Sequence, residues 1–199
     1  MKPLLLATNN PGKVKEMRAL LAALPAPLVL PADLGLKLDV VENGSTYAEN
    51  AALKAGAFSQ ASGMITLADD SGLEVDTLDG LPGLHSHRLL PNPDASDADR
   101  RKRLLELLSG KPFPWRAHFH CTVAIVVPAD KIEYAEGNCP GEIIPRERGS
   151  NGFGYDPIFL LAGMDKTMAE LTMNEKNRLS HRALAVQAAI PLLKQLLAD

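Results

Sequence analysis

The sequence has few cysteines, no excess of positive charge and no long apolar run. Its two cysteines, Cys121 and Cys139, do not form a CxxC motif. This usage is typical of free thiols in a reducing compartment, so we expect a cytoplasmic protein without disulfides. A net charge of −3 excludes a broad basic surface. We therefore expect no binding to nucleic acid.

Membrane-spanning and targeting segments are also missing. No run reaches about 18 apolar residues, so we expect no membrane span. The opening MKPLLLATNN lacks the longer apolar region and the small-residue cleavage site of a signal peptide. We interpret its short apolar run as the first strand. With 199 residues, 46% of them hydrophobic, the chain is expected to form one domain over 1–199, either an ordinary globular domain or one with two lobes.

The hydrophobic pattern mixes strands and helices without strict alternation. It predicts strands at 4–7, 65–68, 115–127, 131–136, 142–145 and 158–161, and two more within 28–41. It predicts helices from Lys13, at 46–62, from Ser96 to near Gly110, and from Ser180 onward, the last with Leu184, Ala188, Leu192 and Leu196 on one side. This order predicts an α/β fold of the mixed α+β type, a mixed sheet flanked by helices.

The run LADDSGLEV at 67–75 is the most informative motif. It predicts a short apolar strand that ends at Asp69 and Asp70, with Ser71 and Gly72 in the turn that follows. Carboxylates fixed at a strand end are suited to hold Mg²⁺ or to take a proton from water. A solvated Asp-Ser-Gly turn explains the motif almost as well.

Two other motifs lie at the edges of predicted elements. TNNPGK at 8–13 predicts a loop followed by a helix that starts at Lys13. A helix N-terminus with a lysine and a glycine suits a phosphate chain, although this is not a Walker loop, and a plain helix cap is the alternative. Glu42, between a predicted strand and a helix, would give Mg²⁺ a second oxygen ligand with Asp70, although most such glutamates are solvated.

The loop GSNGFGYDP at 149–157 combines three glycines with two aromatic side chains. Phe153 and Tyr155 are placed where a base could stack, and Asp156 offers an acceptor for ring N–H groups. The alternative is a long connection between strands with its aromatic side chains in the core.

The segment NEKNRLSHRA at 174–183 places His181 and Arg182 in the first turn of the last predicted helix. Cations are unfavourable there because the helix dipole opposes them, which favours a ligand rich in anionic or carbonyl groups. Lys176 is expected one loop away. A solvated basic turn is the alternative. His118 and His120 share a strand face, but a zinc site is disfavoured because no third ligand is nearby.

Taken in order, TNNPGK, Glu42, LADDSGLEV, GFGYDP and LSHR resemble the non-canonical purine nucleoside triphosphate pyrophosphatases, the inosine/xanthosine triphosphate pyrophosphatase family. The resemblance covers nearly the whole chain. It implies an elongated mixed sheet with two lobes around a central cleft, a homodimer, and Mg²⁺-assisted cleavage of the α–β bond of ITP, dITP and XTP. The products would be the nucleoside monophosphate and pyrophosphate.

The resemblance also implies roles for individual residues. Asp70 would be the general base, and Glu42 and Asp70 would bind the metal. Substrate contacts would come from Thr8, Asn9, Asn10, Pro11, Gly12, Lys13, Ser71, Phe153, Gly154, Tyr155, Asp156, Lys176, His181 and Arg182. His181 and Arg182 would donate to the 6-keto oxygen of the purine, and adenine's amino group would leave those donors unpaired.

Two stretches depart from the family pattern. LHSHRLLPNP at 84–93 keeps only Ser86 and Arg88 of a stretch that borders the cleft in relatives. Val41 precedes Glu42, where many relatives have a second acid, which leaves the number of metal ions open.

Two other functions were considered. A pyrophosphatase for modified pyrimidine nucleotides is disfavoured by His181 and Arg182, whose donors suit a 6-keto purine. A nucleotide sensor is disfavoured by Asp69, Asp70 and Glu42, because a sensor needs no base to activate water.

Overall fold

The computed structural model describes residues 1–92 and 94–198. These residues form two compact units. Unit 1 consists of Met1–Asp70, Cys121–Gly137 and the C-terminal segment from Arg182, and unit 2 consists of Ser71–His120 and Asn138–His181. The chain passes between the units within strands and at the start of the last helix. Pro93 of the divergent stretch, and Asp199, lie outside the described residues.

The described residues include seven strands in one mixed sheet, which confirms the expected fold class. The strands are β1 (Leu4–Leu6), β2 (Leu28–Val29), β3 (Ile65–Val75), β4 (Pro82–Gly83), β5 (Trp115–Val126), β6 (Ile132–Ile143) and β7 (Phe159–Leu161). Their order is β2-β1-β3-β5-β6-β7, with β4 also paired to β3. β1 runs parallel to both β2 and β3. β4 is antiparallel to β3, and β7 is antiparallel to β6.

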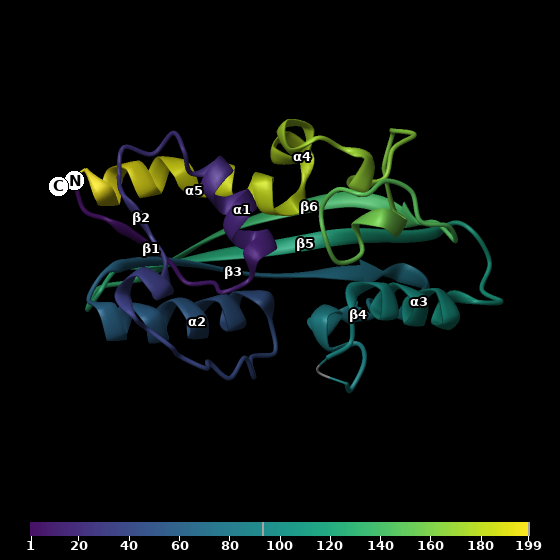
Figure 1. The fold of residues 1–199 in the computed structure, drawn as a ribbon, viewed down its shortest axis with the longest axis horizontal. Coiled ribbons are helices and arrows are strands. Elements are labelled where there is room, and N and C mark those ends of the chain that lie inside the picture. Colours follow the sequence, from purple (N-terminus) through teal and green to yellow (C-terminus); the bar gives the residue numbers. More distant parts are fainter. Residues whose placement is uncertain (93, 199) are drawn as a thin grey trace. The chain divides into compact units, whose positions relative to one another are not determined.

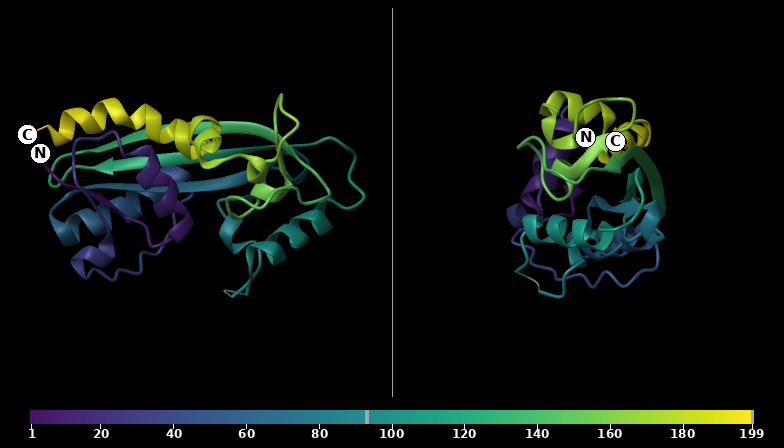
Figure 2. Two further views of the ribbon diagram at one scale, coloured as in Figure 1. Left: turned by 45° about the horizontal axis from the view of Figure 1, so that its top comes forward. Right: turned by 90° about the vertical axis from the view of Figure 1, so that its right-hand side faces the viewer.

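Unit 1 has helices on both faces of its strands (Figure 1). Side chains alternate along β1, so Leu4 and Leu6 share a core with helices α1 (Pro11–Leu20) and α5 (His181–Leu197). Leu5 points to the opposite face and packs with α2 (Tyr47–Ser62). The left-hand view in Figure 2 shows α2 and α5 on opposite sides of the strands. Both faces are buried, which explains the continuous apolar run in β1.

Unit 2 has its own core around helix α3 (Asp97–Leu108). Leu104 and Leu108 of this helix are fully buried with Trp115, Phe159 and their neighbours. Ser96, one of the two cap candidates in the sequence beside Asp97, caps α3, and its hydroxyl accepts from the Asp99 N–H. Helix α4 (Met173–Leu179) and short 3-10 turns complete the unit.

Several predicted elements differ from the structure. Residues 28–41 contain β2 and a 3-10 turn, Pro31–Leu34, but no second strand. The strands predicted at 131–136 and 142–145 are one strand, β6. The last helix buries Ala185, Val186, Ala189 and Leu193, whereas Leu184 and Ala188 of the predicted face are exposed. The buried face therefore includes alanines, which a pattern of leucines alone does not reveal.

Within the described residues, no helix combines the length and the apolar character needed to cross a bilayer.

Candidate active site

The two adjacent carboxylates lie inside a strand, not at the end of one. β3 continues from Ile65 to Val75, and Asp69 and Asp70 are buried at its middle, with 1% and 8% exposure. The predicted turn at Asp69–Gly72 is therefore wrong. Aspartate, serine and glycine are depleted in strands, but here positively charged side chains on both faces compensate the buried charges.

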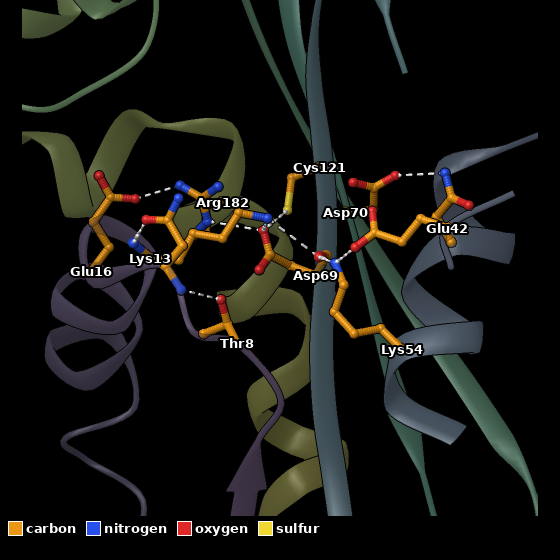
Figure 3. Close-up of polar contacts among 11 residues, drawn as sticks. Thr8, Lys13, Glu16, Glu42, Lys54, Asp69, Asp70, Cys121 and Arg182 are labelled. Carbon is orange, nitrogen blue, oxygen red and sulfur yellow. Dashed lines mark hydrogen bonds and ion pairs between the residues drawn. The ribbon is translucent and has the colours of Figure 1, made fainter. Parts of the chain in front are cut away.

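Asp69 lies on the face of β3 that carries a buried network of charges (Figure 3). Its Oδ2 atom accepts from Lys13 Nζ at 3.0 Å and from Arg182 Nε at 3.1 Å. Burial by itself raises the pKa of Asp69, but the charges of Lys13, Arg182 and Lys54 outweigh it, so the pKa lies well below its ordinary value. Asp69 is therefore ionised and committed to its cations.

Glu16 extends this network to helix α1. Its Oε2 atom accepts from Arg182 Nη1 at 2.5 Å, and both side chains are almost fully buried. The thiol of Cys121 lies 4.0 Å from Asp69 Oδ2, and burial raises its pKa far above the ordinary value. Both cysteines are free and buried, as expected. Charges thus alternate from Lys13 through Asp69 and Arg182 to Glu16.

The TNNPGK motif forms the junction of β1 and α1. The helix begins at Pro11, two residues earlier than predicted, and Asn10 is its N-cap. The Asn10 side chain accepts from the Lys13 N–H at 3.1 Å, and the Asn10 N–H donates to Thr8 Oγ1 at 3.2 Å. Pro11 and Gly12 therefore lie in the first turn, and Asn9 is exposed. Proline is favoured at this position because its missing N–H would be unpaired anyway.

Asp70 points to the other face of β3, toward α2. Its Oδ2 atom accepts from Asn50 Nδ2 at 3.2 Å. Burial raises its pKa above the ordinary value, against the opposing charges of Lys54 and Lys13. Lys54 Nζ bridges the Asp69 carbonyl oxygen, at 3.0 Å, and Glu42 Oε1, at 2.9 Å. Of the two adjacent aspartates, Asp70 is therefore better able to take a proton than Asp69.

Glu42 and Asp70, the two predicted metal ligands, both belong to unit 1. The negative charge of Glu42 acts on Asp70 and helps to raise its pKa. Among the described residues, no group of three or more His, Cys, Asp or Glu side chains is arranged to hold a metal. Two carboxylates nevertheless suit Mg²⁺, which usually keeps waters and substrate phosphates as its other ligands. His118 Nε2 lies 3.3 Å from Glu74 Oε2, and His120 Nδ1 lies 2.8 Å from Asn138 Oδ1.

The loop GSNGFGYDP lies in unit 2 and is held by its own side chains. Asp156 Oδ2 accepts from the Phe153 N–H at 2.9 Å and from Lys176 Nζ at 2.5 Å. The Lys176 ammonium lies 5.0 Å from the centre of the Phe153 ring. Phe153 and Gly154 are half-buried, and Gly154 has a φ of +62°, which favours glycine.

Tyr155 lies in the core, which is one of the two positions that the sequence left open for it. It is 5% exposed and belongs to the core of unit 2. Its hydroxyl donates to the Ser86 carbonyl oxygen at 2.8 Å, and burial raises its pKa. Ser86 also accepts from the Leu73 N–H through its own hydroxyl. Tyr155 therefore ties the loop to the divergent stretch near residue 86.

Lys176 belongs to helix α4, which the sequence did not reveal, and His181 is the first residue of the predicted last helix, α5. Lys176 lies on α4, not in a loop, and is buried. The chain leaves α4 at Ser180, whose extended conformation separates it from α5. The His181 ring stacks on Phe119, with a centroid distance of 4.6 Å and an interplanar angle of 12°. The next residue, Arg182, already belongs to unit 1.

The predicted site residues therefore fall into two groups. Unit 1 contains Thr8, Asn9, Asn10, Pro11, Gly12, Lys13, Glu42, Asp70 and Arg182, and unit 2 contains Ser71, Phe153, Gly154, Tyr155, Asp156, Lys176 and His181. Glu16, Asn50 and Lys54 also contact these groups, although no motif in the sequence singles them out. Glu16 and Arg182 are 166 residues apart in the sequence, so no local pattern indicates their contact. Asn50 and Lys54 are four residues apart on α2, so they lie on the same face of the helix. Once Thr46 marks the start of the helix, their shared face could have been predicted from the sequence.

Comparisons with known proteins give matches over nearly the whole chain. A model of the Ham1 family matches residues 4–192. A dITP/XTP pyrophosphatase of Bacillus licheniformis is 42% identical over 196 residues, covering 98% of this chain and 100% of the relative. One from Geobacillus kaustophilus is 46% identical over 187 residues, covering 94% and 91%. The solved structure of a HAM1 protein from Coxiella burnetii has a TM-score of 0.88 at 36% identity, covering 98% and 100%.

Proposed function

This chain belongs to the Ham1 family, and we propose that it hydrolyses non-canonical purine nucleoside triphosphates, namely ITP, dITP and XTP, to the monophosphate and pyrophosphate. Relatives of nearly the same length are dITP/XTP pyrophosphatases, which supports the substrate class. The observation that carries the proposed chemistry is the alternation at Asp69 and Asp70. One buried strand holds an ionised carboxylate on its cationic face and a carboxylate of raised pKa on the other.

The proposed reaction is an attack of water on the α-phosphorus. Asp70 takes a proton from the water as the new P–O bond forms, and the bridging bond between the α- and β-phosphates breaks. Pyrophosphate leaves with the bridging oxygen. A raised pKa suits this role because it brings the base closer to the operating pH. The hydrogen bond from Asn50 to Oδ2 fixes the orientation of the carboxylate.

We propose Mg²⁺ as the cofactor, held by Glu42 and Asp70. Bound there, it would neutralise charge on the phosphates of the substrate. Lys54, paired with Glu42 at 2.9 Å, keeps that carboxylate in place. Chelation of divalent metal with EDTA should abolish turnover, and added Mg²⁺ should restore it. Full activity in EDTA would exclude this part of the proposal.

Phosphate binding is proposed for the start of α1. The positive end of the helix dipole and the ammonium of Lys13 favour negative charge. Thr8 and Asn10 shape this turn through the cap hydrogen bonds. Lys13 is held at 3.0 Å by Asp69, so its ammonium is positioned before substrate arrives. Asn9, Pro11 and Gly12 contribute backbone to the same turn.

Base recognition is proposed for the residues of unit 2. The half-buried Phe153 would stack on the purine, Gly154 and Ser71 would line the substrate, and Tyr155 would hold the loop from the core. His181 would donate to the 6-keto oxygen. Lys176 and Asp156, already paired with each other, would read the remaining polar edge of the base.

The contacts of Arg182 support a different role from the purine recognition that the resemblance implies. Its guanidinium is 2% exposed and binds Glu16 and Asp69. We therefore assign it to the positioning of Asp69, and through Asp69 of Lys13. Direct contact of Arg182 with the base would require it to leave both carboxylates.

Three wider features are proposed on the strength of the resemblance and the composition. The 199 residues would act as one pyrophosphatase domain, and two copies would form a homodimer. The two free, buried cysteines favour the cytoplasm, where thiols stay reduced.

The test of the proposed function is a substrate panel. The protein is incubated with Mg²⁺ and ITP, dITP, XTP, ATP or GTP, and kcat/KM is measured for each. The proposal predicts high values for the first three and values lower by at least about 100-fold for ATP and GTP. Equal values for all five would exclude the proposed substrate class.

A further inference from the structure

Gly154, in the loop GSNGFGYDP, has both of its peptide groups bound by side chains of helix α3. Its N–H donates to Asp97 Oδ2 at 2.8 Å, and its carbonyl oxygen accepts from Arg101 Nη1 at 2.8 Å. Asp97 and Arg101 are four residues apart, so they lie on the same face of the helix. Together they hold the two peptide groups that flank the Gly154 Cα atom.

The two side chains are themselves fixed by other contacts. Arg101 donates to both carboxylate oxygens of Glu147, from Nε at 2.8 Å and from Nη2 at 3.0 Å. The other oxygen of Asp97 accepts from Arg100 at 2.9 Å. The planar fork of arginine allows the bidentate pair and the carbonyl contact at once, which a lysine cannot reproduce.

These contacts lie next to the proposed stacking residue. The Phe153 N–H is held by Asp156 at 2.9 Å, and the following peptide group is held by Asp97. Gly154 has a left-handed conformation, so the chain turns sharply after Phe153. The direction of the Phe153 ring is therefore set by Asp156 on one side and by α3 on the other.

Arg101 is not needed to attach α3 to the core. Leu104 and Leu108 are fully buried and anchor the helix, and the Ser96 and Asp99 capping box starts it. The Gly154 carbonyl lies in a half-buried loop, where water can replace the lost donor. Loss of the guanidinium should thus change the position of the loop more than the stability of the fold.

We propose that Asp97 and Arg101 are positioning residues that hold the Phe153–Asp156 segment in its base-binding conformation, and so contribute to purine selectivity. The inference rests on the proposed function, in which this segment binds the base. Displacement of a stacking ring by about 1 Å is enough to weaken a preorganised site strongly.

The test compares Arg101→Ala and Arg101→Lys with Arg103→Ala as matched control. Arg103 lies on the same helix, and its half-exposed side chain pairs with Glu106 at 3.3 Å. For Arg101→Ala, KM for ITP should rise by about tenfold while kcat changes by less than about threefold. The preference for ITP over ATP should fall, and inhibition by inorganic tripolyphosphate, which has no base, should stay unchanged. Arg101→Lys should lie between the wild type and Arg101→Ala.

Binding of inosine monophosphate, measured by calorimetry, gives a readout independent of turnover. It should weaken by about tenfold in Arg101→Ala and stay unchanged in Arg103→Ala. An active wild type with identical KM, selectivity and monophosphate affinity in Arg101→Ala and Arg103→Ala would overturn this inference alone. A tripolyphosphate affinity that falls in parallel would also overturn it. If Arg101→Ala is insoluble, Arg101→Lys replaces it in the test, and wild-type behaviour of Arg101→Lys would then overturn the inference. A wild type without purine triphosphatase activity would instead overturn the proposed function.

Discussion

Asp69 and Asp70 are adjacent residues with opposite electrostatic surroundings. Asp69 meets Lys13 and Arg182 within 3.1 Å, and its pKa is lowered. Burial raises the pKa of Asp70 and outweighs the opposing charges of Lys54 and Lys13, while its Oδ2 atom accepts from the neutral amide of Asn50. Because side chains alternate along a strand, one dipeptide places a structural anion and a proposed base on opposite faces.

Replacement of Asp70 tests the proposed base. Asp70→Asn keeps the size and the hydrogen-bonding shape of the side chain but removes the proton acceptor. We expect kcat to fall by about 10²–10⁴-fold, with ITP still bound, as measured by calorimetry. Asp130→Asn, in the exposed turn between β5 and β6, is the matched control and should keep wild-type kcat. Near-normal turnover in Asp70→Asn would remove Asp70 from this role.

His181 tests the reading of the 6-keto group. His181→Ala removes the proposed donor, so the ratio of kcat/KM for ITP over ATP should fall by about tenfold, the value of one buried hydrogen bond. His118→Ala is the control, because that side chain is 37% exposed and pairs with Glu74. If the ratio is the same in both variants, base reading lies elsewhere, with Lys176 or Asp156 as the candidates.

At the residue scale, the sequence identifies several of the important side chains, but it does not show which of them pair with each other. Lys13, Asp69 and Asp70 stand out in their motifs. Glu16 and Lys54 resemble ordinary charged positions on helices, and only the contacts of β3 with α1, α2 and α5 reveal them. Asp69 is separated from Arg182 by 113 residues, beyond the reach of any local pattern.

At the element scale, strand β3 is the main departure from the sequence prediction. Local preference places a turn at Asp-Asp-Ser-Gly, and tertiary ion pairs override it. The capped helices behave differently. Thr46 and Ser96 mark the starts of α2 and α3 correctly, because a cap acts on the next three residues only. Helix α4 was missed since its seven residues are too few for a periodic signal.

The Glu16–Arg182 pair ties helix α1 to helix α5, and its loss should destabilise the protein. Glu16→Gln leaves Arg182 buried with one anion fewer, which typically costs about 3–5 kcal/mol. Glu106→Gln removes the carboxylate of an exposed pair on α3 and should cost less than about 1 kcal/mol. Urea denaturation measures both. Equal unfolding free energies for the two variants would mean that the buried network contributes little to stability.

At the scale of the whole molecule, the two units carry different parts of the proposed chemistry. Unit 1 contains the phosphate turn, the proposed base and the proposed metal ligands, and unit 2 contains the base-binding loop. The mixed sheet was predictable because the hydrophobic pattern indicates most strands. The boundaries of the two units were not predictable, because strands β3, β5 and β6 pass from one unit into the other and no linker marks the crossing points.

The proposed homodimer is a prediction at this scale. Sedimentation equilibrium should give twice the mass of one 21.4 kDa chain at micromolar concentration. Ionic strength should be varied as a control, because a dimer held mainly by surface charge dissociates in salt. A mass of one chain at all concentrations would exclude the dimer.

The most direct test of the account is the position at which water enters the product. ITP is hydrolysed with Mg²⁺ in water enriched in ¹⁸O, and the products are analysed by mass spectrometry. Attack at the α-phosphorus predicts one ¹⁸O atom in inosine monophosphate and none in pyrophosphate. Label in pyrophosphate, or release of orthophosphate, would place the attack at the β- or γ-phosphorus and contradict the proposed mechanism.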